Sequence, residues 1–265
     1  MEKYDVKFKK KFGQNFLKDE SIINRIGDIA EIDRNSLVIE VGPGGGILTR
    51  KLAENAGFVI AYEVDDSLKD ELSKRIGNFN NIDVIYKDFL EADINSDIAK
   101  YKYDKFFFIS NVPYYITTPI INKLIDSGIS FTKIIMMVQK EVGDRLCAKP
   151  GNKEYGSISV FLNYYFYPKA EFFVSRDNFI PVPNVDSVVI SFKAKEKIEI
   201  KNYKYFEELV YDSFKYKRKN LKNNLIGYDL EKVSSVLEKY NLNLMSRAEE
   251  LDVCVFIDLA NTLCE

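Results

Sequence analysis

The sequence predicts an α/β fold, a doubly wound and mostly parallel sheet with an antiparallel edge, followed by a small all-α domain. Three observations support this. Short apolar runs alternate with helical patterns through the first two-thirds of the 265 residues. From residue 157 to 193, strand-like runs follow one another without long helices between them. Near residue 195 the pattern becomes helical throughout.

The parallel part of the sheet is predicted by runs that are apolar throughout, as in strands covered on both faces. These runs are 36–41, 57–64, 81–87, 105–110 and 133–139. Helical patterns lie between them at 47–56, 66–76 and 117–128. Strands joined by helical crossovers of this length indicate a doubly wound sheet.

The antiparallel edge is predicted from the runs 157–166, 170–175 and 185–193. A charged linker, 193–202, then leads to three helical patterns, at 205–225, 229–240 and 246–263. We therefore expect two domains, residues 1–195 and 196–265.

Composition excludes several kinds of protein. A hydrophobic content of 46% and a charged content of 29% are ordinary for a globular chain. No apolar run approaches the roughly 20 residues of a membrane span, and the N-terminus has no secretory pattern, so a cytoplasmic location is expected. Cys147, Cys254 and Cys264 are too widely spaced for a metal site. Histidine is absent, which excludes imidazole catalysis and His-bound zinc.

Charge is unevenly distributed although the net charge is only −2. Residues 1–18 hold six lysines against two acids, and residues 213–224 hold five basic residues and no acid. Two basic segments in a net-acidic chain are read either as contacts to nucleic-acid phosphates or as solvated surface. The second segment is expected on a helix.

A glycine-rich turn follows the first strand, with glycines at 42, 44 and 46. It matches neither the dinucleotide fingerprint nor a phosphate loop. Glu40, just before the turn, would repel a pyrophosphate and attract an ammonium group. S-adenosylmethionine, which carries an ammonium and a sulfonium, fits that charge.

Polar residues also follow the next three strands. Glu63 is placed to accept ribose hydroxyls, and Asp88 to accept from an adenine amino group or to cap a helix. The fourth strand runs into Asn111 and Pro113. In an open α/β sheet the carboxyl ends of the strands line one crevice, so these residues are expected to form one site.

These features resemble the class I S-adenosylmethionine-dependent methyltransferases. The stretch Asn-Val-Pro-Tyr is similar to the Asn/Asp-Pro-Pro-Tyr element of enzymes that methylate amino nitrogens of bases. The wider set of motifs is similar to the ribosomal RNA adenine dimethyltransferase family, above all to its bacterial small-subunit branch, and covers nearly the whole chain. Those motifs are KFGQNFL (11–17), NVPYYITTP (111–119), MVQKEVGDRL (137–146), YGSISVF (155–161) and PVPNVDSVVISF (181–192).

The resemblance implies a site for S-adenosylmethionine, with S-adenosylhomocysteine as product and no metal. The implied cofactor-binding residues are Asn15, Leu17, Gly42, Gly44, Glu63, Asp88 and Asn111. The implied catalytic residues are Asn111, Val112, Pro113 and Tyr114. Phe179 is the implied residue for stacking on the target base, and Tyr114 is expected to stack on it as well. From the charge of the second basic segment, we expect Lys217, Arg218 and Lys219 to bind the substrate through its phosphates. Two positions depart from the family pattern: Val112 replaces a leucine, and Tyr115 replaces an asparagine and is expected to pack in the core.

The implied reaction is methyl transfer to N6 of two adjacent adenosines in the 3′-terminal hairpin of small-subunit rRNA, within the immature small ribosomal subunit, by a monomeric enzyme. Two alternatives stay open: a large-subunit rRNA dimethyltransferase of the macrolide-resistance type, and a non-catalytic RNA-binding assembly factor on the same scaffold. Carbon methylation of pyrimidines needs a cysteine nucleophile, and no cysteine follows a strand of the predicted crevice.

Overall fold

The computed structural model describes residues 15–196 and 198–264, which form two compact units. The sheet unit comprises residues up to 143 together with 169–194, and the helical unit comprises 144–168 together with the residues from 195 onward. The sequence placed residues 144–168 in the first domain, whereas the structure groups them with the C-terminal helices. The division of function between the two predicted domains stays a prediction.

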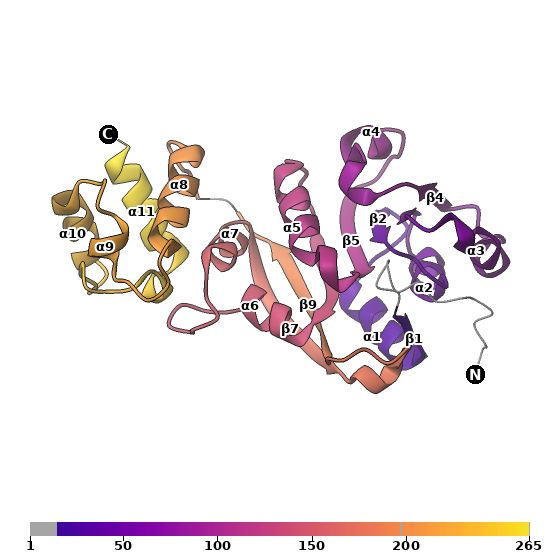
Figure 1. Ribbon diagram of the computed structural model, residues 1–265. Coiled ribbons are helices and arrows are strands. Elements are labelled where there is room, and N and C mark those ends of the chain that lie inside the picture. Colours follow the sequence, from indigo (N-terminus) through magenta and orange to yellow (C-terminus); the bar gives the residue numbers. More distant parts are fainter. Residues whose placement is uncertain (1–14, 197, 265) are drawn as a thin grey trace. The chain divides into compact units, whose positions relative to one another are not determined.

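The sheet unit is built on seven strands in the order β4-β3-β2-β5-β6-β9-β7 (Figure 1). The strands are β2 (Ser36–Val41), β3 (Phe58–Glu63), β4 (Ile82–Tyr86), β5 (Lys105–Asn111), β6 (Lys133–Gln139), β7 (Phe166–Val174) and β9 (Ser187–Ala194). The first five pair in parallel, and β9 pairs antiparallel with β6. The predicted doubly wound sheet with an antiparallel edge is confirmed.

Helices cover both faces of this sheet. They are α1 (Glu20–Ala30), α2 (Ile47–Asn55), α3 (Lys69–Ile76), α4 (Ile94–Ile98), α5 (Thr117–Asp126) and α6 (Lys140–Leu146). Buried residues of α1 and α2 pack against Phe107 and Ile109 of β5. The alternate residues Phe106 and Phe108 point the other way, because successive side chains of a strand face opposite sides. They meet Phe131 and Phe89 on the other face of the sheet, and the short turn that carries Phe89 contacts α5.

A separate two-stranded ribbon pairs a segment from the start of the chain with a segment that lies between β7 and β9 in sequence. Strand β1 (Phe16–Leu17) pairs antiparallel with β8 (Phe179–Ile180), and the backbone N–H of Lys18 donates to the Asn178 carbonyl at 2.8 Å. Leu17 and Phe179 are buried in the same core as α1. The ribbon thereby holds Phe16 and Leu17 in a fixed place before α1.

The helical unit contains α7 (Ser157–Tyr165), α8 (Tyr203–Phe214), α9 (Leu221–Asn224), α10 (Leu230–Glu238) and α11 (Val253–Leu263). Its core centres on Phe206 of α8 and Phe256 of α11, both fully buried. Within the residues that the structure describes, no helix of either unit has the length and apolar character needed to cross a membrane.

The strand predicted at 157–166 is wrong, because residues 157–165 form helix α7 and only Phe166 belongs to a strand, β7. Its Phe161 and Tyr164 lie on one side of the helix, with ring centroids 6.0 and 5.7 Å from that of Phe206. Ser159 accepts from the Gly156 N–H at 3.2 Å, which stabilises the first turn. Aromatic and β-branched residues favour strands only weakly, so packing in the helical unit decides the outcome.

The basic segment 213–224 is also not the continuous helix that the sequence predicted. Helix α8 ends at Phe214 and α9 begins at Leu221, and residues 215–220 form a turn between them. Asn224 holds this turn, because its Nδ2 donates to the Ser213 carbonyl at 2.7 Å and its Oδ1 accepts from the Tyr216 N–H at 3.3 Å.

Candidate active site

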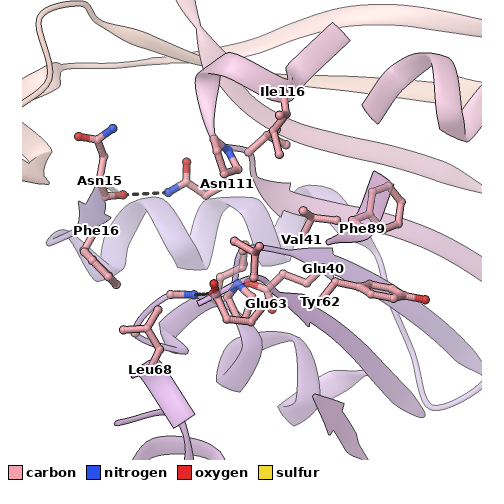
Figure 2. A pocket seen from close by; sticks show the side chains of 18 of the residues that line it. Asn15, Phe16, Glu40, Val41, Tyr62, Glu63, Leu68, Phe89, Asn111 and Ile116 are labelled. Atoms are coloured by element: carbon pink, nitrogen blue, oxygen red, sulfur yellow. Dashed lines mark hydrogen bonds between the residues drawn. The ribbon is translucent and has the colours of Figure 1, made fainter. Parts of the chain in front are cut away.

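A pocket of the sheet unit opens where β2, β3, β4 and β5 end, and the β1 segment forms one of its walls (Figure 2). Every residue of the predicted cofactor and catalytic sets lines it. The main lining residues are Asn15, Phe16, Leu17, Glu40, Gly42, Gly44, Glu63, Leu68, Asp88, Asn111, Val112, Pro113, Tyr114, Tyr115 and Ile116. The predicted meeting of these residues at one edge of the sheet is therefore observed, and their roles stay proposals.

The glycine turn forms the floor of the pocket in a conformation that other residues rarely adopt. Gly42 and Gly44 have φ of 71° and 55°. The Gly42 N–H donates to the Tyr62 carbonyl at 2.9 Å. A Cβ added to Gly44 would lie 2.8 Å from Cε1 of Phe16, so the Phe16 ring rests directly on this turn.

Glu63, at the end of β3, is held by the turn that it faces. Its Oε2 accepts from the Gly44 N–H at 3.3 Å, and its Oε1 accepts from the Asp65 N–H at 2.9 Å. The side chain is almost fully buried, and this burial raises the pKa of the Glu63 carboxyl above its usual value, although the two hydrogen bonds oppose the rise. Glu63 is thus fixed in the direction of the pocket.

Glu40, one residue before the end of β2, is buried without full hydrogen bonding. Its side chain is 1% exposed, and no described residue hydrogen-bonds to Oε2 with good geometry. Burial raises the pKa of the Glu40 carboxyl to about 8, and the nearby negative charge of Glu63 adds to the rise. The Thr49 side chain opposes it. A carboxyl in this state would be stabilised by a positive group of a ligand.

The pocket therefore fits S-adenosylmethionine. A glycine floor lets the backbone approach the ligand closely, and two buried carboxyl groups favour a ligand with positive charge over a pyrophosphate. At the far side, Asp88 uses Oδ1 to accept from the Leu90 N–H at 2.8 Å, as a cap. The other carboxylate oxygen has no hydrogen bond among the described residues and suits an amino donor.

Gly44→Ala should weaken S-adenosylmethionine binding by roughly tenfold, since it adds left-handed strain and displaces the Phe16 ring from the turn. Calorimetric titration measures this affinity. The matched control is Gly128→Ala at the end of α5, where φ is 68° and a Cβ would meet nothing within 4 Å. The control should lose about 1 kcal/mol of stability and bind the cofactor normally. Wild-type affinity in Gly44→Ala would contradict this role of the turn.

Asn111, the last residue of β5, is oriented by Asn15, which directly precedes β1. Its Nδ2 donates to the Asn15 carbonyl at 3.3 Å, drawn as the dashed line between Asn15 and Asn111 in Figure 2. Because the nitrogen is engaged there, the side-chain oxygen of Asn111, a residue that lines the pocket, is left as an acceptor. The backbone N–H of Val112 donates to the Met137 carbonyl at 3.3 Å, which ties the motif to β6.

The two tyrosines of the motif lie in different environments. Tyr114 is half-buried, its hydroxyl lies 2.7 Å from Oγ of Ser187, and burial raises the pKa of its phenol. Tyr115 is 59% exposed and lines the pocket. Core packing of Tyr115 was predicted, and that prediction is wrong, because the 3-10 turn Tyr114–Ile116 directs this ring outward.

Phe179, of the sheet unit, and three predicted substrate residues of the helical unit are not among the residues that line the pocket. Phe179 is fully buried in the core beside Leu17 and is not a lining residue, so stacking on a base would require it to leave that packing. Lys217, Arg218 and Lys219 are exposed in the turn of the helical unit. Five lysines of the other basic segment, at positions 3, 7, 9, 10 and 11, lie outside the described residues.

Sequence reasoning missed several residues of the site, among them Phe16 in the pocket wall and Ser187, which contacts Tyr114. Phe16 and Ser187 both lie inside motifs that carried the family resemblance, 11–17 and 181–192, but nothing in the sequence says what they contact. Among the described residues, no group of three acidic or cysteine side chains is arranged to hold a metal ion. The expected lack of a metal stays a prediction.

Comparison with known proteins decides the family. The model of the family described as ribosomal RNA adenine dimethylase matches residues 5–263. The chain belongs to this family. The ribosomal RNA adenine dimethylase resemblance of the sequence is thereby confirmed over nearly the full length.

Relatives within the ribosomal RNA adenine dimethylase family include two proteins named ribosomal RNA small subunit methyltransferase A. The protein of Streptococcus gordonii is 43% identical over 99% of this chain and 94% of its own length. The protein of Ligilactobacillus salivarius is 43% identical over 99% of this chain and 92% of its own length.

Two solved structures share the fold over most of the chain. A dimethyladenosine transferase from Plasmodium falciparum has a TM-score of 0.78 and 27% identity, covering 92% of this chain and 95% of that one. The 23S rRNA methyltransferase ErmE has a TM-score of 0.78 and 26% identity, covering 95% of this chain and all of that one.

Proposed function

We propose that the protein transfers methyl groups from S-adenosylmethionine to N6 of two adjacent adenosines in the 3′-terminal hairpin of small-subunit rRNA, giving N6,N6-dimethyladenosines. The single observation that carries this proposal is the 43% identity to small-subunit methyltransferases over nearly the whole of both chains. The pocket supports the same reaction, because its motif presents acceptors for an amino nitrogen beside a site suited to a positively charged cofactor.

The chemistry required of the chain is orientation of a poor nucleophile. When bound, S-adenosylmethionine supplies a methyl group already activated on a sulfonium. The adenine amino nitrogen delocalises its lone pair into the ring, so acceptors that bind its hydrogens favour attack. The Asn111 side-chain oxygen and the Val112 carbonyl are those acceptors, and Pro113, with φ of −55°, aims that carbonyl. No general base with a shifted pKa is needed, since the methylated nitrogen loses its proton to water.

Tyr114 supplies a ring on which the target base stacks after it has left the RNA, an interaction worth about 1–3 kcal/mol. Burial keeps its phenol protonated, because burial raises its pKa. Rate enhancement then comes from placement of dipoles and reacting atoms, without an imidazole.

The large-subunit alternative is not favoured. The large-subunit enzyme among the solved structures, ErmE, is 26% identical, against 43% for the small-subunit relatives. The non-catalytic alternative is disfavoured by a pocket in which all the predicted cofactor and catalytic residues meet. Calorimetry with S-adenosylmethionine separates the two remaining cases: an enzyme binds the cofactor, and absence of binding would favour a purely structural assembly factor.

The decisive experiment is methyl incorporation into unmodified small ribosomal subunits, with large subunits as the parallel substrate and the modified nucleoside identified. We expect N6,N6-dimethyladenosine in the small subunit. Incorporation only into the large subunit, or into another nucleoside, would overturn the proposed function. As part of the same proposal, the enzyme acts in the cytoplasm, as a metal-free monomer, on immature small subunits.

Besides Tyr114, which stacks on the target base, the turn at residues 215–220 is proposed to bind RNA. Lys215, Lys217, Arg218 and Lys219 are exposed there, and Tyr216 between them is 58% exposed. No ion pair of the described residues involves these cations. Cations around an exposed aromatic ring suit a partner that offers phosphates and bases.

Neutralising this turn with Lys217→Gln, Arg218→Gln and Lys219→Gln should weaken RNA binding and reduce the slope of log affinity against log salt by about 2 to 3. Filter binding to the small-subunit rRNA over a range of salt concentrations measures this slope. The control replaces three other exposed lysines of the helical unit, Lys149, Lys153 and Lys232. An unchanged slope in the first variant, or an equal reduction of the slope in the control, would show that the turn does not bind RNA and is ordinary solvated surface.

A further inference from the structure

The hydroxyl of Tyr114 is hydrogen-bonded to a side chain that no part of the mechanism uses. Oγ of Ser187 lies 2.7 Å from the Tyr114 oxygen. Ser187 is fully buried and is the first residue of β9, where it stands opposite Gln139 of β6. It therefore belongs to the rigid sheet, whereas Tyr114 belongs to the short turn after β5.

Tyr114 is fixed at two separate points. Near its backbone, the Ile116 N–H donates to the Pro113 carbonyl at 3.1 Å, and Oγ1 of Thr117 donates to the Tyr114 carbonyl at 3.3 Å. At the far end of the ring, Ser187 holds the hydroxyl. The hydroxyl oxygen lies on the long axis of the ring, so the hydrogen bond to Ser187 fixes the direction of that axis, and the Tyr114 side chain cannot change its χ1 rotamer without breaking it. The ring is therefore held in one place before any base arrives.

Asp186, the residue beside Ser187, holds the start of β9 in place through hydrogen bonds of its own and takes no part in the bond between Ser187 and Tyr114. Oδ1 of Asp186 accepts from the Arg176 N–H at 3.0 Å, and the Asp186 carbonyl accepts from the Lys140 N–H at 2.9 Å. The start of β9 is thus tied to α6 and to the turn before β8. Ser187 is left with the Tyr114 hydroxyl as its side-chain partner among the described residues.

We propose that Ser187 is a positioning residue, which fixes the direction of the Tyr114 side chain and so the place of the ring on which the target adenine stacks. The inference rests on the proposed function and adds a residue to it. Because the ring is oriented in advance, the base does not have to order it on binding, and the amino nitrogen is presented to Asn111 in one geometry.

The test is a double-mutant cycle with Ser187→Ala and Tyr114→Phe, because Tyr114→Phe keeps the ring and removes only the tether. In single-turnover methyl transfer at saturating S-adenosylmethionine, each single variant should be slower by roughly fivefold to tenfold. The double variant should be no slower than Tyr114→Phe alone. Cofactor affinity should stay within about twofold of wild type in all three variants.

Ser191→Ala is the matched control on the same strand. Ser191 is also buried, and its Oγ donates to Oε1 of Glu171 at 2.7 Å, away from the pocket. This variant loses a hydrogen bond of the same length and should lose stability, yet transfer methyl groups at the wild-type rate. A wild-type rate in Ser187→Ala, multiplying effects in the double variant, or an equal slowing in Ser191→Ala would overturn the proposal.

A second measurement separates this proposal from the proposed function. NMR of Cβ-labelled tyrosine, with the Tyr114 signal assigned by Tyr114→Phe, measures the three-bond couplings that report the χ1 rotamer in the protein without RNA. A single rotamer is expected in the wild type and averaged couplings in Ser187→Ala. Averaged couplings in the wild type would refute the tether, even if the enzyme methylates rRNA. A single rotamer in a protein that does not methylate rRNA would refute only the proposed function.

Discussion

Replacing Asn111 with alanine is expected to lower the rate of methyl transfer by at least about a hundredfold, with cofactor affinity reduced less than about fivefold. The variant loses the side-chain oxygen that accepts from the adenine amino group. It also loses the hydrogen bond from Nδ2 to the Asn15 carbonyl, which is a contact to one wall of the cofactor pocket. Single-turnover transfer and calorimetric titration, run on the same preparation, measure the two effects.

The neighbouring residue provides the control for this variant. Ser110 is buried on the same strand, and its Oγ donates to the Val41 carbonyl at 2.6 Å. Ser110→Ala should cost about 1 kcal/mol of stability and change the rate at saturating substrate by less than about threefold. If Asn111→Ala transferred methyl groups at a near-normal rate, the assignment of the motif as the catalytic centre would be lost.

Replacing Glu40 with glutamine is expected to stabilise the protein without cofactor at pH 7 and to weaken cofactor binding. The ordinary pKa of a glutamate is 4.5, and that of Glu40 in the folded protein is about 8. Between these values the folded protein holds a proton that the unfolded chain has released. The free energy of unfolding therefore falls as the pH rises, by up to about 1.4 kcal/mol per pH unit.

A neutral side chain removes this pH dependence. Glu40→Gln should equal the wild type near pH 4.5 and exceed it in free energy of unfolding by on the order of 3 kcal/mol at pH 7. Denaturant unfolding across this range measures the difference, and titration with S-adenosylmethionine should show an affinity at least roughly tenfold lower. Equal stability of variant and wild type at both pH values would show that folding does not raise the pKa of Glu40.

Glu63→Gln separates burial from hydrogen bonding. Burial also raises the pKa of Glu63, but its two oxygens accept from two backbone N–H groups. A glutamine would turn an amide nitrogen toward one of these donors. This variant should therefore lose stability at pH 7, the opposite of Glu40→Gln, and a gain would mean that the two carboxyl groups share one role.

The arrangement of the site followed from the sequence because it depends on strand ends. The turn after residue 41, Glu63, Asp88 and Asn111 each follow a run that is apolar throughout, and parallel strands bring such ends to one edge. Both readings of Asp88 are compatible with the structure, since one carboxylate oxygen caps a turn and the other is left toward the pocket.

Features that depend on packing between distant segments were not predictable. Residues 157–166 have the composition of a strand, and only the core around Phe206 makes them a helix. The turn after α8 follows from hydrogen bonds of Asn224 that no periodicity reveals. The tether of Tyr114 joins residues 73 positions apart. A single sequence carries no signal for such a pairing.

The ribbon of β1 and β8 has a consequence for biosynthesis. Asn15 and Phe16 form a wall of the cofactor pocket, and their strand partner comprises residues 179 and 180. A nascent chain can pair β2, β3, β4 and β5 once residue 111 has left the ribosome, but the N-terminal wall must wait for a partner more than 160 residues away. Pairing between such distant segments is slow, because the chain loses the entropy of loop closure before the new contacts stabilise it. The glycine turn and both buried glutamates are therefore synthesised long before they can retain a cofactor, and this enzyme of ribosome maturation becomes competent only when its own translation is two-thirds complete.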